Sequence, residues 1–328
     1  MFMKRMGCPG VTQHELFLGS IVTVHSRQLK LVDYGDLFTK KRFEPASERT
    51  FALIKPDCYT STGKIIDAVY KSGFTISRLK MSKFTGPSHC DAFYADHIGA
   101  AYFADLSSFM QSDVSTGMEL VAENAVQKFR DLLGPRESAT AKVEAPNSLR
   151  AMFGTDGRRN AAHGSDSSAN YQRESDLFFG KTFAPTAAFN NCTCAVIKPH
   201  IVQEGKAGQV IDMILQEGFE ISSMEMFTLD RPTAEEFFEV YKGVLPEFVG
   251  MVEHMTTGPC IVLEVRQENA VKSFRELCGP TDPEIAKYLR PNTIRAKFGH
   301  SRTINAIHCT DLEEDGLLEV EYFFSILQ

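Results

Sequence analysis

The feature that most constrains this chain is a repeat that returns after 145 residues. The segment 149–154 (Leu-Arg-Ala-Met-Phe-Gly) returns at 294–299 (Ile-Arg-Ala-Lys-Phe-Gly). The segment 160–166 (Asn-Ala-Ala-His-Gly-Ser-Asp) returns at 305–311 (Asn-Ala-Ile-His-Cys-Thr-Asp). A period of this size is the length of one domain, so it indicates a duplicated domain and not a solenoid of short repeats. We therefore expect the chain to build one fold twice.

The repeat divides the 328 residues into four parts. We expect one domain at 49–176, a linker at 177–189, a second domain at 190–328, and a short N-terminal piece at 1–48. In the N-terminal piece, segments 21–25 and 28–32 alternate apolar and polar residues, which predicts a β-hairpin with its turn at Ser26-Arg27. Two strands alone are marginal, so this piece must lean on another part or be the remnant of a larger module. The basic cluster at 40–42 favours a solvated linker over a targeting signal.

Bulk composition excludes several classes of protein. The net charge of −7 disfavours nonspecific binding of nucleic acid. The longest apolar runs, such as 260–263, are far too short to span a membrane, and the hydrophobic and charged fractions are those of a soluble globular protein. The eight scattered cysteines favour reduced thiols in an intracellular protein over a disulfide framework.

Local patterns predict the same order of elements in each copy: strand, helix, strand, helix, strand, helices, an irregular loop and a last strand. An apolar strand at 52–55 is stopped by Pro56, a helix around 65–70 ends at Gly73, and a strand follows at 75–81. The second copy has a clean central strand at 259–265. This order predicts an α+β fold with an antiparallel sheet and helices on one face.

The chemistry is concentrated around two histidines. His163 and His308 each have an Arg thirteen residues earlier, an Asn three residues earlier and a Glu eleven residues later. A neutral imidazole beside a guanidinium suits a nucleophile that accepts a phosphoryl group, because histidine is largely uncharged at neutral pH and arginine binds phosphoryl oxygens. The sequence therefore predicts two related phosphate-handling pockets.

These motifs resemble the nucleoside diphosphate kinase family, and they do so twice. The motifs that carry the resemblance are Ile-Lys-Pro-Asp at 54–57, Gly-Phe at 73–74 and Asn-x-x-His-Gly-Ser-Asp at 160–166. A tandem pair behind a short β piece resembles a two-domain branch of that family, in which a DM-type β module precedes the kinase domains. The resemblance implies two ferredoxin-like domains with four-stranded antiparallel sheets. It also implies transfer of a γ-phosphoryl group from ATP to nucleoside diphosphates through a phosphohistidine, with Mg²⁺ bound to the nucleotide.

The resemblance also implies a role for each matching residue. His163 and His308 match the nucleophile, and Glu174 and Glu319 match the acid that holds it. The residues that match the nucleotide-binding set are Lys55, Tyr94, Tyr102, Arg130, Arg136, Arg150 and Asn160 in the first copy, and Lys198, Tyr241, Arg275, Thr281, Arg295 and Asn305 in the second. Each has a structural alternative: the arginines as helix-face ion pairs, the tyrosines as core aromatics, the asparagines as turn residues, and Thr281 as a helix cap.

Departures from the family pattern separate the two copies. In the first copy Arg136 replaces the threonine seen at Thr281, Tyr102 takes the place of the aromatic over the base, and the polar segment 112–117 predicts a locally distorted central strand. In the second copy His200 replaces Asp57 and Glu247 replaces the stacking ring. The stretch from Tyr241 to Met255 is two residues shorter than that from Tyr94 to Met110, which predicts a shortened lid. We expect the second site to bind nucleotide weakly.

Two functional hypotheses follow. The first is an enzyme that exchanges phosphoryl groups between ATP and nucleoside diphosphates, mainly through His163. The second, implied by the resemblance to the tandem branch, is a largely non-catalytic protein of the cilium, axoneme or centrosome that binds tubulin among the microtubule inner proteins, or a γ-tubulin complex. No partner nucleic acid or membrane is expected. The tandem is expected either to pair its own copies as a monomeric pseudo-dimer or to form a homo-oligomer.

Overall fold

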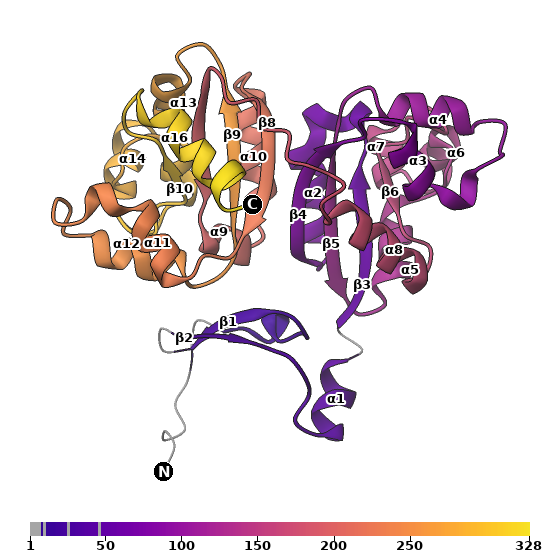
Figure 1. Cartoon of the computed structure of the whole chain (residues 1–328), viewed down its shortest axis with the longest axis horizontal. Coiled ribbons are helices and arrows are strands. Elements are labelled where there is room, and N and C mark those ends of the chain that lie inside the picture. Colours follow the sequence, from indigo (N-terminus) through magenta and orange to yellow (C-terminus); the bar gives the residue numbers. More distant parts are fainter. Residues whose placement is uncertain (1–7, 9–10, 25–26, 45–46) are drawn as a thin grey trace.

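The computed structural model describes residues 8, 11–24, 27–44 and 47–328, and the predicted hairpin turn at Ser26 lies outside this described part. Two lobes stand side by side, each built on a sheet with helices, and a small two-stranded sheet lies below them in Figure 1. The indigo-to-magenta lobe holds the first copy of the repeat (domain A), and the orange-to-yellow lobe holds the second (domain B).

The N-terminal part and domain A contain the first half of the elements. The N-terminal elements are η1 (Gln13–Glu15), β1 (Ile21–Val24), β2 (Arg27–Lys30) and α1 (Leu37–Phe43). Domain A contains β3 (Glu48–Ile54), η3 (Pro56–Ser61), α2 (Thr62–Lys71), β4 (Thr75–Lys83), α3 (Pro87–Phe93), η4 (Ala95–His97), α4 (Phe103–Met110), β5 (Val114–Ala122), α5 (Ala125–Leu133), α6 (Ser138–Glu144), α7 (Leu149–Phe153), β6 (Ala162–Gly164) and α8 (Ser168–Phe178).

Domain B repeats this order. Its elements are β7 (Cys192–Ile197), α9 (Pro199–Gln203), α10 (Ala207–Gln216), β8 (Glu220–Phe227), α11 (Arg231–Phe237), η5 (Glu239–Tyr241), α12 (Phe248–Met255), β9 (Cys260–Arg266), α13 (Ala270–Cys278), α14 (Pro283–Leu289), α15 (Ile294–Phe298), β10 (Ile307–Cys309), α16 (Asp315–Glu321) and η6 (Tyr322–Ile326). The predicted strand–helix order is thus present in both copies.

The two four-stranded sheets join into one antiparallel sheet of eight strands. Its order is β10-β7-β9-β8-β4-β5-β3-β6, so each domain contributes four consecutive positions. The strands of the two domains meet where Lys80 of β4 pairs with Glu225 of β8. The predicted antiparallel α+β architecture is confirmed, and the two sheets are continuous with one another.

Helices cover both faces of the sheet, so the expectation of helices on one face is wrong. In domain A, α2 and α5 pack on Ala52 and Ile54, while α3, α4 and α8 pack on the opposite side against Phe51 and Leu53. Most residues of β3, β5, β7 and β9 are buried on both faces, so these strands lack the alternation of buried and exposed residues that would reveal a single covered face. The same two-sided arrangement recurs in domain B.

The expected distortion of the central strand in domain A is also wrong. β5 begins at Val114 and pairs without interruption with β3 from Ile54↔Thr116 to Glu48↔Ala122. Gly117 is needed here because a side chain at this position would collide with the ring of Phe178 of α8. This ring packs against Phe51 of β3 and covers the glycine. Aromatic packing over the glycine replaces the missing side chain. The irregularity lies instead in β4, between Ile76 and Arg78, and β8 has the same irregularity between Ile221 and Ser223.

The two domains pack through α2 and α10 around an approximate twofold axis. A side chain at Gly63 would collide with the backbone of Gly208 and Asp212, and one at Gly208 would collide with the backbone of Gly63 and Asp67. Gly63 and Gly208 are equivalent positions of the repeat, as are Asp67 and Asp212, so the contact is reciprocal, as in an isologous dimer interface. One continuous apolar core runs through both domains beneath these helices.

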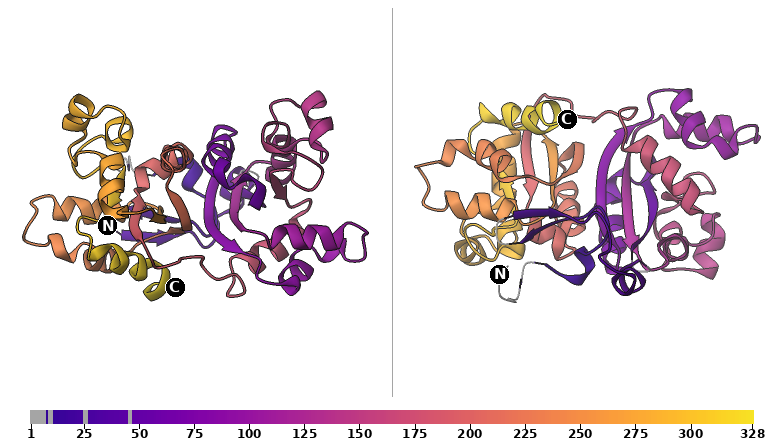
Figure 2. Two further views of the ribbon diagram at one scale, coloured as in Figure 1. Left: turned by 90° about the horizontal axis from the view of Figure 1, so that it is seen from above. Right: turned by 60° about the horizontal axis from the view of Figure 1, so that its bottom comes forward.

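The N-terminal hairpin contacts both domains, as its position across the two lobes in Figure 2 indicates. Thr23 Oγ1 donates to the carbonyl of Thr256 at 2.5 Å, and Gln28 Nε2 donates to the carbonyl of Leu229 at 2.7 Å, both in domain B. On the other side, Arg49 of domain A bonds the carbonyl of Leu18. The hairpin therefore gains from tertiary contacts the stability that two strands lack. The basic cluster at 40–42 lies on α1, a two-turn helix with no buried residues.

Candidate active site

Each domain holds its central histidine on the short last strand. His163 lies on β6 and His308 on β10, each opposite the first strand of its domain. His163 Nε2 lies 3.0 Å from Glu174 Oε2, and His308 Nε2 lies 2.8 Å from Glu319 Oε2. The same carboxylate accepts a second bond, from Ser165 in domain A and Thr310 in domain B. A carboxylate that accepts from Nε2–H leaves the lone pair on Nδ1, so both imidazoles have the tautomer of a nucleophile.

A strained turn precedes each histidine. Ala161 and Ala306 have positive φ angles of 68° and 75°, which residues other than glycine rarely adopt. The backbone N–H of Lys55 bonds the carbonyl of Ala161, and that of Lys198 bonds the carbonyl of Ala306, both at 2.9 Å. In domain A the carboxylate of Asp57 also accepts from the N–H of Ala161 at 3.2 Å. The motif at 54–57 thus holds the turn that presents His163.

A cationic pocket of about 450 Å³ opens beside His163. Several arginines line this pocket, and guanidinium groups bind phosphate oxygens through paired N–H donors. The lining includes all of the candidate residues of domain A except Glu174, which lies behind the histidine: Lys55, Tyr94, Tyr102, Arg130, Arg136, Arg150, Asn160 and His163.

Lys55 is the buried cation of this pocket. Its Nζ donates to Asn160 Oδ1 at 2.6 Å and to the carbonyl of Arg158 at 3.1 Å. Burial, and then the nearby charge of Arg150, lower the pKa of Lys55 to about 7. Arg150 donates through Nη1 to the carbonyl of Gly134 and through Nη2 to that of Ala162, while its Nε–H is buried without a partner among the described residues. Donors that lack protein acceptors are the ones an anionic ligand can use.

Aromatic side chains form one wall of the pocket in domain A. The rings of Phe93 and Tyr94 each lie 5.5 Å from the imidazole of His163. Tyr102 bonds His97 Nδ1 through its hydroxyl at 2.7 Å, and the guanidinium of Arg136 lies 4.9 Å from its ring centre. The Tyr102 ring is therefore held at the mouth of the pocket, where a planar base can stack.

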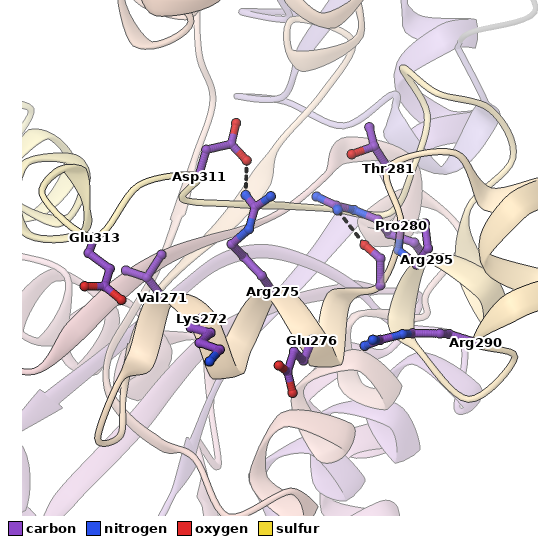
Figure 3. A pocket seen from close by; sticks show the side chains of 11 residues that line it. Val271, Lys272, Arg275, Glu276, Pro280, Thr281, Arg290, Arg295, Asp311 and Glu313 are labelled. Carbon is purple, nitrogen blue, oxygen red and sulfur yellow. Dashed lines mark hydrogen bonds and ion pairs between the residues drawn. The ribbon is translucent and has the colours of Figure 1, made fainter.

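In domain B the corresponding cations are already paired. Arg275 forms an ion pair with Asp311, which also accepts from Tyr241 at 2.7 Å. Arg295 uses all of its nitrogens within the protein: it donates to the carbonyls of Ile307 and Gly279 and to the sulfur of Cys309. Figure 3 shows Arg275 turned toward Asp311 and Arg295 turned toward the chain at Pro280. A recess of about 500 Å³ lies beside them, and neither Lys198 nor His308 lines it.

An ion-pair bridge in domain B holds the residue that corresponds to Tyr102. Arg302 binds Glu247 Oε1 and Asp282 Oδ2, both at 3.1 Å. Glu247 precedes α12 at the position that Tyr102 occupies before α4. Domain B therefore has a carboxylate tied to an arginine where domain A has a ring. His200, which replaces Asp57, bonds His254 at 2.9 Å and makes no bond to the strained turn.

Two predicted equivalences between the domains are corrected by the element boundaries. Tyr94 follows α3 directly and Phe238 follows α11 directly, so Phe238 and not Tyr241 corresponds to Tyr94. Tyr241 ends η5 as His97 ends η4. The segment between η5 and α12 then has six residues (242–247), against five between η4 and α4 (98–102). The lid of domain B is thus one residue longer and not shorter, because the sequence comparison paired the wrong tyrosines.

The pockets also contain residues that the sequence reasoning missed. His97 and Arg158 line the pocket of domain A, and Arg158 forms an ion pair with Asp105 of α4. The remaining candidates of domain B are spread more loosely: Lys198 donates to the carbonyl of Thr303, Asn305 donates to the carbonyl of Thr281, and Asn305 Oδ1 is buried without a partner among the described residues. Their counterparts Lys55 and Asn160 are bonded to each other.

This geometry agrees with the comparisons to known proteins. The family model described as nucleoside diphosphate kinase matches residues 48–183 and again residues 191–327. The chain belongs to the nucleoside diphosphate kinase family.

Relatives within the family match either the whole tandem or one of its domains. The chain is 48% identical to nucleoside diphosphate kinase homolog 7 of Rattus norvegicus over 330 residues, which cover 99% of this chain and 83% of the relative. The protein of the same name from Mus musculus matches with the same identity and coverage. A single-domain nucleoside diphosphate kinase of Aquifex aeolicus is 38% identical over 136 residues, which cover 42% of this chain and 95% of that enzyme. The resemblance to the tandem branch of the family is confirmed. No helix in the described part of the chain is long and apolar enough to cross a membrane.

Proposed function

We propose that domain A transfers a γ-phosphoryl group from ATP to nucleoside diphosphates through a phosphohistidine at His163. The observation that carries the proposal is the pocket itself. It joins a histidine whose Nε2 is held by Glu174 to a group of cations whose donors are not all used by the protein. Phosphoryl transfer requires stabilisation of negative charge, and the cations that line this pocket support that role.

The reaction has two matched halves. The lone pair on His163 Nδ1 attacks the γ-phosphorus of ATP, the bond between this phosphorus and the bridging oxygen breaks, and ADP leaves. Glu174 accepts the Nε2–H bond throughout and stabilises the positive charge that forms on the imidazole. A second nucleoside diphosphate then takes the phosphoryl group from Nδ1, which restores the neutral histidine.

The arginines and Lys55 have the charge needed for the phosphate oxygens, and Tyr102 has the flat surface needed for the base. Among the described residues no group of three acidic, histidine or cysteine side chains is placed to hold a metal ion. Asp166 is the acid that lines the pocket. Mg²⁺ would enter with the nucleotide, and Asp166 is the residue that would offer it an oxygen ligand. Bound Mg²⁺ would share the negative charge of the phosphates.

The test is a labelling experiment on the full chain. The protein is incubated with γ-labelled ATP and Mg²⁺, and acid-labile label is measured for the unaltered chain, for His163→Ala, for His308→Ala and for the double variant. We expect His163→Ala to remove nearly all of the label and His308→Ala to remove little. Equal labelling of the double variant and the unaltered chain would refute transfer through either histidine.

We propose for domain B a binding role, within a ciliary or centrosomal assembly that contains tubulin. Its cations are paired within the protein, and its lid exposes several apolar side chains, namely Val240, Val244 and Val249. Exposed apolar groups on a lid suit contact with another protein better than contact with a nucleotide. The test is co-sedimentation with microtubules, with Val244→Asp and Val249→Asp as variants. Recovery of the unaltered chain entirely in the supernatant would contradict a microtubule partner and leave the γ-tubulin complex to be tested by affinity capture.

A further inference from the structure

A pair of cysteines lies directly behind the histidine of domain B and has no counterpart in domain A. Cys309 follows His308 on β10, and Cys278 ends α13. At the repeat distance of 145 residues, domain A has Gly164 and Leu133 at these positions. Both cysteines are buried in the same apolar core, with exposed fractions of 2% and 0%. Neither takes part in the phosphoryl transfer proposed above.

The fold places the two side chains against each other. In domain A, a Cβ atom at Gly164 would lie 3.0 Å from Leu133 Cδ1, so the two positions point at the same spot. In domain B both positions hold cysteine, so the two thiols are placed next to each other in the same apolar core. Both positions therefore differ between the copies, with glycine and leucine in domain A and two cysteines in domain B.

The surroundings of Cys309 favour its thiolate. Arg295 Nη2 donates to Cys309 Sγ at 3.4 Å. The neighbouring Cys278 thiol, and then the positive charge of Arg295, lower the pKa of Cys309 against the effect of burial, while burial raises the pKa of Cys278. A thiolate beside a neutral thiol is the arrangement of an attacking and a resolving cysteine.

A surface recess of domain B reaches the residue that contacts Cys309. Arg295, whose guanidinium donates to the sulfur of Cys309, lines this recess of about 500 Å³. Figure 3 shows Arg295 beside the recess together with Arg275 and Thr281. A small neutral oxidant that enters the recess would approach the sulfur from the side of Arg295.

We propose that Cys278 and Cys309 form a redox-active dithiol that reacts with hydrogen peroxide to give a disulfide between α13 and β10. The Cys309 thiolate attacks one oxygen of the peroxide, the O–O bond breaks, and Cys309 becomes a sulfenic acid while the released hydroxide takes up a proton. The sulfur of Cys278 then attacks Cys309, the S–OH bond breaks, and the second oxygen leaves as water with the proton of Cys278. Two thiols and one peroxide give one disulfide and two waters.

The disulfide would alter domain B at its phosphate end. It removes the thiolate that accepts from Arg295, and it links the helix that carries Arg275 to the strand that carries His308. The pair therefore makes domain B, and not domain A, responsive to oxidation. This site is independent of catalysis at His163.

The test uses the full chain, reduced and then exposed to equimolar hydrogen peroxide under native conditions. Free thiols are alkylated after unfolding, and the peptides are mapped by mass spectrometry without reduction. We expect two thiols per chain to be lost and a Cys278–Cys309 peptide to be the main product. The peptide should be absent from Cys278→Leu, which has the residue of domain A, and from Cys309→Ser. Cys194→Ala should leave it unchanged, because Cys194 lies on the other face of the sheet, in the second core of domain B.

A readout that does not depend on cross-linking covers the case of a variant that fails to fold. In folded Cys278→Ser, a sulfenic-acid probe should label Cys309, and Arg295→Gln in that background should slow the labelling several-fold. Absence of the linked peptide from the unaltered chain, together with absence of sulfenic acid from Cys278→Ser, would overturn the proposal. Labelling of all eight cysteines at similar rates would overturn it as well.

Discussion

The two domains hold the same histidine–glutamate pair in the same place and differ in whether the surrounding cations are already satisfied. Arg150 and Arg295 each donate to two backbone carbonyls, but Arg150 keeps a buried Nε–H with no partner among the described residues, whereas every side-chain nitrogen of Arg295 has a partner. Arg275 is paired with Asp311, and no ion pair of Arg130 is found in the described part of the chain. A nucleophile alone therefore does not make a phosphate site. The site also needs donors that the protein leaves unused.

The residues at the entrances of the two pockets also differ in whether they are already bound within the protein. Tyr102 offers a ring in domain A, and Glu247 in domain B is tied to Arg302, which also binds Asp282. A nucleotide entering domain B would have to break this bridge and would gain no stacking in return. The difference between the domains thus lies around the reacting atoms, and it can be tested by exchanging residues between them.

The largest effect is expected from the carboxylate behind the histidine. Glu174→Gln keeps the shape of the side chain but removes its charge, so Nε2–H is held less firmly and the imidazolium formed during transfer is less stable. We expect phosphohistidine formation to slow by about a hundredfold. Glu319→Gln is the matched control, and it should leave the rate within about twofold. Rapid-quench measurement of labelled protein gives both rates. Equal losses in the two variants would show that both domains turn over.

A reciprocal exchange at the mouth of the pockets should have the next largest effect. Tyr102→Glu removes the stacking ring of domain A and should weaken ADP binding about tenfold, since stacking contributes ~1–3 kcal/mol per base. Glu247→Tyr, made in that background, should restore binding through domain B, because it supplies a ring and releases Arg302. Titration calorimetry measures both changes.

Glu247→Ala separates the two causes in this exchange. It breaks the bridge to Arg302 without adding a ring. If Glu247→Ala restores binding as well as Glu247→Tyr does, closure by the bridge and not the loss of stacking keeps nucleotide out of domain B. If neither variant binds ADP, the main reason is that the hydrogen-bond donors of Arg295 are already used within the protein.

Nucleotide binding by domain A should weaken as pH rises above neutrality. The pKa of Lys55 is lowered to about 7 by burial and by Arg150, and a bound phosphate would raise it again. Below about pH 7 the lysine is already charged, and affinity should be nearly constant. Above that value binding must take up a proton, so affinity should fall by up to about tenfold per pH unit. Calorimetry in buffers of different ionisation enthalpy measures the proton uptake, and Lys55→Arg should remove it.

Sequence reasoning found the parts of the site that are close in the chain or fixed by the repeat. Glu174 lies eleven residues after His163 and reaches it from the helix that follows β6, a spacing that the second copy repeats. The bridge from Arg302 to Asp282 and Glu247 joins residues 20 and 55 positions apart, and only the fold brings them together. No corresponding bridge is found among the described residues of domain A, so the repeat did not indicate this one.

The wrong pairing of Tyr94 with Tyr241 has a related origin. Identity of residue type suggested it, whereas the helix ends place Phe238 after α11 and Tyr241 one short turn later. The helices on both faces were missed because buried strands carry apolar residues on either side. In both cases the sequence showed which residue types are present. Which residues correspond, and which strand faces are covered, could be decided only from the helix ends and the packing.

The smallest of the four effects concerns Arg136, where domain A has a guanidinium and domain B has Thr281. The guanidinium lies 4.9 Å from the centre of the Tyr102 ring, a contact of roughly 0.5–1 kcal/mol, and it adds positive charge beside Lys55 and Arg150. Arg136→Thr should therefore weaken ADP binding about threefold and make the affinity less dependent on salt, because one screened attraction is lost. The reverse change, Thr281→Arg in domain B, should gain almost nothing, since Glu247 offers no ring on which the guanidinium can rest. Tighter ADP binding by Arg136→Thr would mean that the Arg136 guanidinium competes with the base for the face of the Tyr102 ring. Nucleotide binding to domain A would then require this guanidinium to leave the ring.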